Sequence, residues 1–265
     1  MKGKVAVITG GNGTLGSAFA KGLAKAGATV FILGRNAGKS RKRVNEFKKM
    51  NLTIHATTCD VLDEKSVQAA AKRILKKVGK VDILINGAGG NMPGATVMPD
   101  KSIFDLSIDQ FRKVADLNLL GTVIPSLVFA KSMVKQGSGN IINISSLAAQ
   151  LPLTRVVGYS ASKAAIDNFT RWLAVEMASK YDEGIRVNAI APGFFIAEQN
   201  RSLLLQEDGS LTARGQTIIS QTPAKRFGEP EELVSTLLWL CDDKSTFVNG
   251  IVVPVDGGFS AFSGV

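Results

Sequence analysis

The sequence predicts one α/β domain over residues 1–265, with a doubly wound parallel sheet of about seven strands and helices on both faces. Short apolar and β-branched runs bounded by turn residues alternate with helix-length amphipathic segments. This pattern is typical of βαβ units whose strands are buried on both faces. No Pro/Gly/Ser-rich linker, low-complexity tract or internal repeat divides the chain, which favours a single domain.

The expected strands, each a run of β-forming residues, are 5–9, 29–33, 53–58, 81–85, 140–144, 186–190 and 251–253. The expected helices, each an amphipathic segment between two strands, are 15–26, 38–50, 63–78, 107–136, 158–180 and 230–241. The last helix begins Pro-Glu-Glu, which places a proline in the first turn and carboxylates near the positive end of the helix dipole.

Between residues 197 and 227 the helical pattern weakens into short amphipathic pieces around 203–205 and 216–219, interrupted by Gly209 and Gly215. A long segment of this kind inside a compact domain is typical of a lid or binding loop. It follows the sixth strand, at the carboxyl edge where such sheets bind ligands. We therefore expect a lid-like insertion over 197–227 beside the ligand site.

The charge balance is strongly basic, with 32 Lys and Arg against 22 Asp and Glu and a net charge of +10. Such a balance can indicate nucleic acid as a partner. Here the lysines are dispersed over helical segments such as 39–49 and 72–80, without interleaved aromatic residues, so a solvated lysine-rich surface is favoured. We expect no nucleic-acid partner, and a positive field that favours anionic cofactors and substrates.

We expect a cytoplasmic protein with no membrane partner, because no apolar run is recognised as long enough to span a bilayer and the start of the chain passes directly into a strand. Cys59 and Cys241 lie far apart and form no metal or redox motif, which fits reduced thiols. No cluster of metal ligands is recognised, so no metal site is expected.

A glycine-rich turn, Thr-Gly-Gly-Asn-Gly-Thr-Leu-Gly over residues 9–16, separates the first expected strand from the first helix. Glycines permit a tight turn and close approach of the backbone to a diphosphate, and the helix N-terminus presents free N–H groups to its charge. The sequence therefore predicts a dinucleotide site. Its expected contacts are Gly10, Asn12, Gly13, Thr14, Leu15 and Gly16.

The second expected strand ends in Gly34-Arg35, where an enzyme that uses NAD normally has a carboxylate for the adenosine ribose. A guanidinium suits a 2′-phosphate, and no carboxylate is left to repel it. We therefore expect NADP (NADPH) to be favoured over NAD. The alternative is that Arg35 only stacks on adenine and either cofactor is accepted.

Tyr159 and Lys163 stand four residues apart in an expected helix and would share one face, with Ser146 thirteen residues upstream. A lysine charge beside a tyrosine favours the phenolate, so we expect the phenol's pKa to be lowered toward neutrality. Such a pair could transfer a proton to or from substrate without a histidine, and the chain has only one histidine. Taken alone, the spacing is common by chance.

With these residues in view, the chain resembles the short-chain dehydrogenase/reductase family over nearly its whole length, and the resemblance implies a Rossmann fold. It implies a catalytic tetrad of Asn118, Ser146, Tyr159 and Lys163. It also implies cofactor contacts at Tyr159 and Lys163 and at Asp60, Val61, Asn86, Gly87, Ala88, Pro192, Gly193 and Phe195. Two positions depart from the family pattern: Thr14 stands where a glycine is usual, and Ala197 where a threonine often contacts the cofactor.

The resemblance also implies the division of labour. Tyr159 would give a proton to the substrate oxygen or remove it, and the nicotinamide would carry the hydride. Ser146 would position that oxygen, Lys163 would hold the nicotinamide ribose, and Asn118 would anchor water for a proton relay. The family commonly forms tetramers through its long helices and C-terminal strand, and the apolar end 259–265 suits burial in a homotetramer.

Within the family, the chain is most similar to the bacterial D-mannonate oxidoreductase (fructuronate reductase) and gluconate 5-dehydrogenase type, through 86–91, 118–121, 191–195, 198–201 and 255–265. This implies an anionic sugar-acid substrate, with conversion of D-fructuronate to D-mannonate as the first expectation. Gluconate 5-dehydrogenase and 3-oxoacyl-thioester reductase are the enzyme alternatives, although a thioester would require a more apolar lid. A cofactor-binding sensor without chemistry is the non-enzyme alternative.

A sugar acid needs a cation for its carboxylate and polar groups for its hydroxyls. Arg201 is the first candidate, with Asn91 and Arg155 behind it, although a surface salt bridge is an equal alternative for Arg201. The basic stretch 225–228 directly precedes the Pro-Glu-Glu helix start. We expect it to brace that turn rather than to bind substrate.

Overall fold

The computed structural model describes residues 1–198 and 200–264. Its centre is a parallel seven-stranded sheet in the order β3-β2-β1-β4-β5-β6-β7. The strands are β1 (Val5–Thr9), β2 (Thr29–Gly34), β3 (Ile54–Thr58), β4 (Ile83–Asn86), β5 (Gly139–Ile144), β6 (Ile185–Pro192) and β7 (Val252–Val255). The predicted doubly wound sheet of about seven strands is confirmed.

The helices that connect the strands also follow the predicted pattern. They are α1 (Thr14–Lys25), α2 (Ala37–Lys49), α3 (Glu64–Val78), α4 (Ile108–Ala115), α5 (Gly121–Gln136), α6 (Val157–Lys180), α7 (Arg201–Leu204), α8 (Ala213–Gln221) and α9 (Leu233–Cys241). The single helix expected over 107–136 is α4 and α5 joined by a π-helical turn, Asp116–Leu120. Periodicity could not reveal that turn, because a π turn adds a residue without ending the helix.

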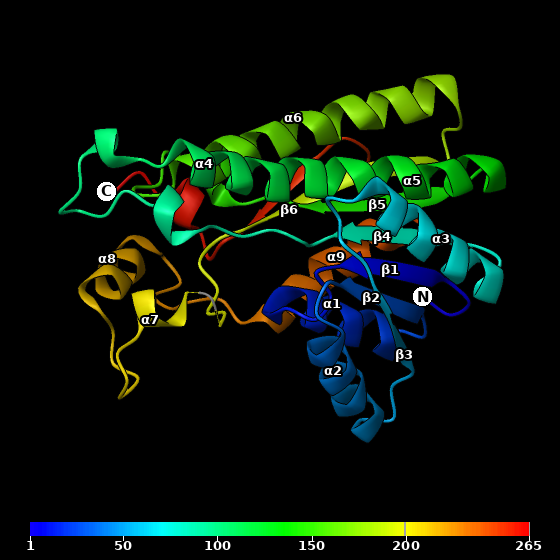
Figure 1. Cartoon of the computed structure of the whole chain (residues 1–265), viewed down its shortest axis with the longest axis horizontal. Helices are drawn as coiled ribbons and strands as arrows, with labels where there is room; N and C mark the ends of the chain where they lie inside the picture. Colours follow the sequence, from blue (N-terminus) through cyan, green and yellow to red (C-terminus); the bar gives the residue numbers. More distant parts are fainter. Residues whose placement is uncertain (199, 265) are drawn as a thin grey trace.

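Helices cover both faces of the sheet (Figure 1), and an apolar cluster lies between the sheet and the helices on each side. Successive residues of a strand face opposite sides, so Val5 and Val7 pack with α3, α5 and α6, whereas Ala6 and Ile8 pack with α1, α2 and α9. Burial on both faces explains why the strands are continuous apolar runs. It also leaves the ends of the strands as the place where polar groups can meet.

The segment after β6 forms a separate small unit, as predicted for 197–227. Figure 1 shows α7 and α8 at one end of the molecule, beyond the sheet. Leu204, Ile218 and Phe227 form its own apolar cluster. Arg226 pairs with Glu232 through two hydrogen bonds of 2.8 and 2.6 Å, which confirms that the basic stretch 225–228 braces the helix start.

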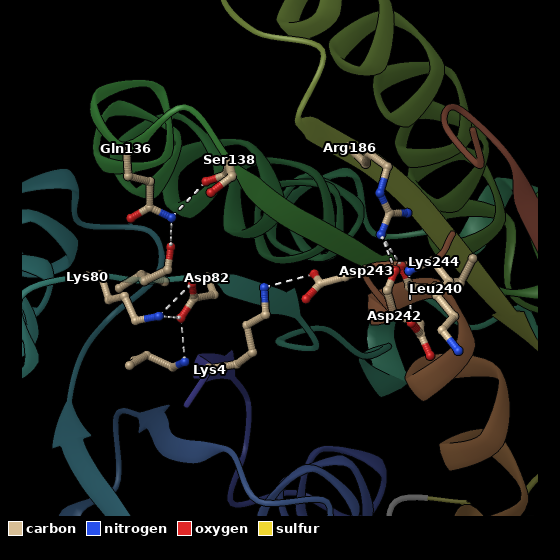
Figure 2. A network of polar contacts seen from close by, with 12 residues as sticks. Lys4, Lys80, Asp82, Gln136, Ser138, Arg186, Leu240, Asp242, Asp243 and Lys244 are labelled. Carbon is tan, nitrogen blue, oxygen red and sulfur yellow. Dashed lines mark hydrogen bonds and ion pairs between the residues drawn. The ribbon is translucent and has the colours of Figure 1, made fainter. Parts of the chain in front are cut away.

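The amino ends of the strands carry a network of paired charges (Figure 2). Lys4 pairs with Asp243 at 2.8 Å, and Asp82 accepts from the backbone N–H of Val5 at 2.7 Å and pairs with Lys80 at 3.0 Å. The buried Arg186 donates to the carbonyls of Leu240, Asp242 and Val248. These polar groups satisfy one another, so this edge fastens the strands together.

By length and composition alone, the stretch Ile108–Gln136 is apolar enough to cross a membrane. The expectation that no apolar run reaches this length was therefore wrong for this stretch. In the fold its two helices pack against α3 and α6, and a buried core helix passes the same test.

Candidate active site

A cavity of about 440 Å³ opens at the carboxyl edge of the sheet, where β1, β2, β4, β5 and β6 end. It brings together most of the predicted site residues. Those that line it are Gly10, Asn12, Gly13, Thr14, Leu15, Gly16, Arg35, Val61, Gly87, Ala88, Ser146, Tyr159, Lys163, Pro192, Gly193 and Phe195. The cavity therefore joins the glycine turn at one end to the Ser146–Tyr159–Lys163 group at the other.

The glycine turn has the geometry that anion binding requires. Gly10 has φ +66°, and a Cβ there would stand 2.7 Å from the carbonyl oxygen of Gly87. The first turn of α1 has no acidic residue and no side-chain cap, so its free N–H groups remain available to a diphosphate. Gly13 has an ordinary extended conformation, and Thr14 simply opens the helix. The threonine at position 14 is therefore compatible with a phosphate-binding turn.

The adenosine end of the cavity explains the glycine at the end of β2. A Cβ on Gly34 would stand 2.5 Å from Nδ2 of Asn12, whose amide donates to Oγ of Ser40 at 2.9 Å. Asn12 thus occupies the space where another enzyme could place a carboxylate. Arg35 is exposed here, and Lys39, which sequence reasoning missed, also lines the cavity.

Lys39 forms an ion pair of 2.8 Å with Glu198, the second residue of the lid segment. The two residues lie 159 positions apart, so no local pattern could have found the pair. Ala197 lines the cavity and donates its N–H to Oδ1 of Asn200 at 2.8 Å. Asn200 also donates to the carbonyl of Phe195 at 2.9 Å, so its side chain fixes the start of the lid.

Two expected cofactor residues lie behind the cavity rather than on its wall. Asn86 is buried and donates to Oγ of Ser126 and Oδ1 of Asn143, both at 2.8 Å, so it supports the turn that follows β4. The carboxylate of Asp60 accepts from the N–H of Leu62 at 3.1 Å. Asp60 does not line the cavity, whereas Val61 beside it does.

Asn118 sits in the π-helical turn and is fully buried. Its Nδ2 donates to the carbonyls of Gly90 and Val114 at 2.7 and 2.8 Å, and its Oδ1 accepts from the N–H of Gly90 at 3.1 Å. The side chain is therefore fully engaged in joining this turn to the loop after β4. It borders the site from behind, through Gly89, and does not line the cavity.

Ser146, Tyr159 and Lys163 come together as predicted. Ser146, just after β5, lines the cavity together with Tyr159 and accepts a hydrogen bond from the N–H of Ala148 at 3.2 Å. Nζ of Lys163 lies 5.4 Å from the centroid of the Tyr159 ring and donates to the carbonyl of Ile144 at 2.6 Å. The helical spacing places the ammonium and the phenol on the same face of α6, beside the end of β5.

The expected lowering of the phenol's pKa is wrong for the protein without cofactor. Burial raises the pKa of Tyr159, and the nearby hydroxyl of Ser146 only partly opposes this. Burial also lowers the pKa of Lys163 from 10.5 to about 8. Sequence spacing indicates which charges are neighbours but not how much water is lost around them, and here desolvation is the larger effect on both groups.

Asp167, one helical turn beyond Lys163, is a buried carboxylate that sequence reasoning missed. It accepts a hydrogen bond from Oγ of Ser145, and burial raises its pKa. Its charge acts to raise the pKa of Lys163, although burial of the lysine outweighs it. The i, i+4 spacing after Lys163 was the available signal.

The three substrate candidates do not meet at the cavity wall. Nδ2 of Asn91 donates to Oγ1 of Thr96 at 2.8 Å. Arg201 borders a different cavity, of about 420 Å³, beside Lys21 and Arg43. Arg201 therefore lines a cavity beside α1 and α2 and not the cavity that holds Tyr159. Arg155 lies just before α6, with φ +78°.

Within the part of the chain that the structure describes, no group of three or more His, Cys, Asp or Glu side chains could hold a metal ion.

Comparisons with known proteins agree with this geometry. The chain is 49% identical to an uncharacterized oxidoreductase of Bacillus subtilis, UxuB, with 100% of this chain and 98% of the relative covered. A solved structure from Haemophilus influenzae, provisionally named a D-mannonate oxidoreductase and with bound NAD, has a TM-score of 0.92 at 44% identity, covering 100% of this chain and 98% of that one.

A gluconate 5-dehydrogenase from Burkholderia cenocepacia in complex with NADP and tartrate has a TM-score of 0.87 at 31% identity, covering 98% of this chain and 96% of that one. The sequence profile of the short chain dehydrogenases matches residues 4–208, most of the chain and all of the glycine turn and tetrad. The chain therefore belongs to the short-chain dehydrogenase family and is an NAD(P)-dependent oxidoreductase that acts on CH–OH groups.

Proposed function

We propose that the protein interconverts a secondary alcohol and a ketone on a sugar acid, with D-fructuronate and D-mannonate as the substrate pair. The observation that carries the proposal is the single cavity that holds the glycine turn at one end and Ser146, Tyr159 and Lys163 at the other. The relatives of the protein include enzymes named for sugar acids, which supports this substrate class. Gluconate 5-dehydrogenase activity is the runner-up.

The residues of the cavity fit a nicotinamide dinucleotide. The uncapped first turn of α1 and the close approach of Gly10 to Gly87 suit a diphosphate, and Pro192, Gly193 and Phe195 line the end nearest Tyr159. When bound, the nicotinamide supplies or accepts the hydride.

The proton is handled by the protein's own side chains. Tyr159 gives its phenolic proton to the substrate oxygen during reduction, and Ser146, which lines the same cavity, orients that oxygen. A protonated Lys163 stabilises the phenolate and holds the nicotinamide ribose. Asn118 holds the loop at Gly90 in place, so its role is to support the wall of the site from behind.

We propose that NADP is favoured over NAD. Arg35 and Lys39 both border the adenosine end of the cavity, and β2 ends in Gly34, so no carboxylate from that strand meets a 2′-phosphate. Glu198 also borders the cavity, and its pairing with Lys39 offsets its charge. One related structure holds NAD and another holds NADP. The proposed preference for NADP therefore rests on Arg35 and Lys39 of this chain.

We also propose a cytoplasmic homotetramer. Large apolar side chains on the outer faces of α5 and α6 are exposed, among them Leu127, Trp172 at 56% and Val175 at 67%. Such a surface suits burial against another subunit. The apolar C-terminal segment 259–265 is the second expected contact between subunits. Within it Phe262 is partly exposed, and Val265 lies outside the described residues.

The test is to replace Tyr159 with phenylalanine and follow NAD(P)H absorbance with D-fructuronate and 5-ketogluconate. Turnover should fall by about 1,000-fold or more, because phenylalanine has no proton to donate to the substrate oxygen. Cofactor affinity, measured by fluorescence titration, should stay near the wild-type value. Substantial residual turnover would refute the role of Tyr159, and a wild-type enzyme inactive on every keto sugar acid would refute the substrate class.

A further inference from the structure

Two arginines come together where α8 of the lid contacts the segment that leads into α6. Arg214, from α8 of the lid, donates through Nη1 to Oγ1 of Thr154 at 3.3 Å, and Arg155 is the next residue along the chain. Neither arginine forms an ion pair with a carboxylate of the described residues. The lid therefore brings a second cation beside Arg155, which lies in the segment between β5 and α6.

The position of Arg155 ties this pair to the site. Its carbonyl accepts from the N–H of Val97 at 2.9 Å, which joins the loop after β4 to the segment that leads into α6. Tyr159 follows in the first turn of that helix. Four positions separate Arg155 from Tyr159, so their Cα atoms are at most about 14 Å apart, and both arginines lie outside the wall of the cavity itself.

The arrangement is unfavourable for the protein alone. Arg155 has φ +78°, a backbone conformation that residues other than glycine rarely adopt. Burial and the neighbouring charge of Arg155 both lower the pKa of Arg214. An anion held between the two guanidinium groups would relieve this repulsion.

We propose that Arg155 and Arg214 together bind the carboxylate of the substrate. The assignment rests on the proposed sugar-acid function and names the residues that recognise the acid. Two guanidinium forks suit a carboxylate, which can accept from both at once. In D-fructuronate the ketone and the carboxylate lie near opposite ends of the carbon chain. Tyr159 therefore contacts the ketone oxygen while the arginine pair binds the carboxylate.

Because one cation comes from α8, the carboxylate also draws the lid onto the site. Charge recognition and closure thus depend on the same contact, and an uncharged ketose would leave the two arginines repelling each other. The proposal explains why Arg201, in the same lid, has a different environment, since it faces the cavity between α1 and α2.

The experiment compares D-fructuronate with D-fructose, which carries the same ketone but has a hydroxymethyl group in place of the carboxylate. In Arg155→Gln and Arg214→Gln, kcat/KM for D-fructuronate should fall by roughly 30- to 100-fold, mostly through KM, because the contact is made equally in the ground and transition states. Activity with D-fructose and the affinity for NADPH should stay within about twofold, and Arg→Lys at either position should restore part of the preference.

Arg201→Gln is the matched control, an arginine of the same lid that should leave both substrates unchanged. Where D-fructose turnover is too slow to measure, D-mannonate binding to the NADP complex of the Tyr159→Phe enzyme gives the same comparison by calorimetry. An unchanged KM for D-fructuronate in both variants, or a loss that Arg201→Gln reproduces, would overturn the assignment while the proposed function stands. A wild-type enzyme inactive on all keto sugar acids would overturn both.

Discussion

Lys163→Met should make the protein without cofactor more stable while abolishing turnover. Lys163 is 5% exposed, and burial lowers its pKa from 10.5 to about 8. At 1.36 kcal/mol per pH unit, this shift means that the charged lysine destabilises the folded state by about 3 kcal/mol. Loss of the bond to the carbonyl of Ile144 offsets about 1 kcal/mol, which leaves a net gain of about 2 kcal/mol at pH 7.

The sign of the pH dependence follows from the lowered pKa. Below pH 8 the lysine is protonated in both folded and unfolded states, so the folded state carries the full penalty. Between pH 8 and 10.5 the unfolded chain binds more protons than the folded one, so wild-type stability rises with pH. The advantage of Lys163→Met should therefore be complete at pH 7 and nearly gone at pH 9.5.

Urea unfolding followed by circular dichroism at pH 7 and pH 9.5, without cofactor and at one protein concentration, measures this difference. Lys72→Met is the matched control, since it makes the same change at an exposed position of α3 and should alter stability by less than about 0.5 kcal/mol. A Lys163→Met protein less stable than wild type at pH 7, or an advantage that does not shrink at pH 9.5, would refute the reasoning.

Two further predictions concern the walls of the cavity. In Gly89→Ala the new Cβ would stand 2.6 Å from Oδ1 of Asn118, so we expect the bonds of Asn118 to Gly90 to weaken, with a loss of about 1–3 kcal/mol in urea unfolding and a lower kcat. Unchanged stability and kcat would contradict this. In Arg35→Ala the KM for NADPH should rise about tenfold while that for NADH hardly changes, because only NADPH carries the 2′-phosphate. Steady-state kinetics with both cofactors checks this, and an equal rise for both would mean that Arg35 serves only the shared adenosine.

Much of the fold and part of the site could be predicted from local patterns. The strand and helix bounds agree with the structure to within a few residues, because burial on both faces makes each strand an apolar run and each helix amphipathic. The glycine turn and the Tyr159–Lys163 pair were found for a similar reason. Backbone conformation and i, i+4 spacing are local properties, so sequence distance and spatial distance agree there.

Tertiary packing decided what those groups do. Burial raises the pKa of Tyr159 where spacing predicted a fall, because loss of water depends on what covers the residue. Asn12 fills the space above Gly34, and Glu198 pairs with Lys39, through contacts between distant segments.

The substrate residues show the same division between sequence and structure. The sequence by itself determined a parallel sheet, a dinucleotide turn and a proton-transfer pair, since each is encoded within a few residues. The sequence shows every arginine, but it does not show which arginines lie near one another in the folded protein. Packing of the lid turned Arg201 toward α1 and α2 and brought Arg214 to Thr154, 60 residues away, because the direction of a side chain is set by the surface on which its helix rests.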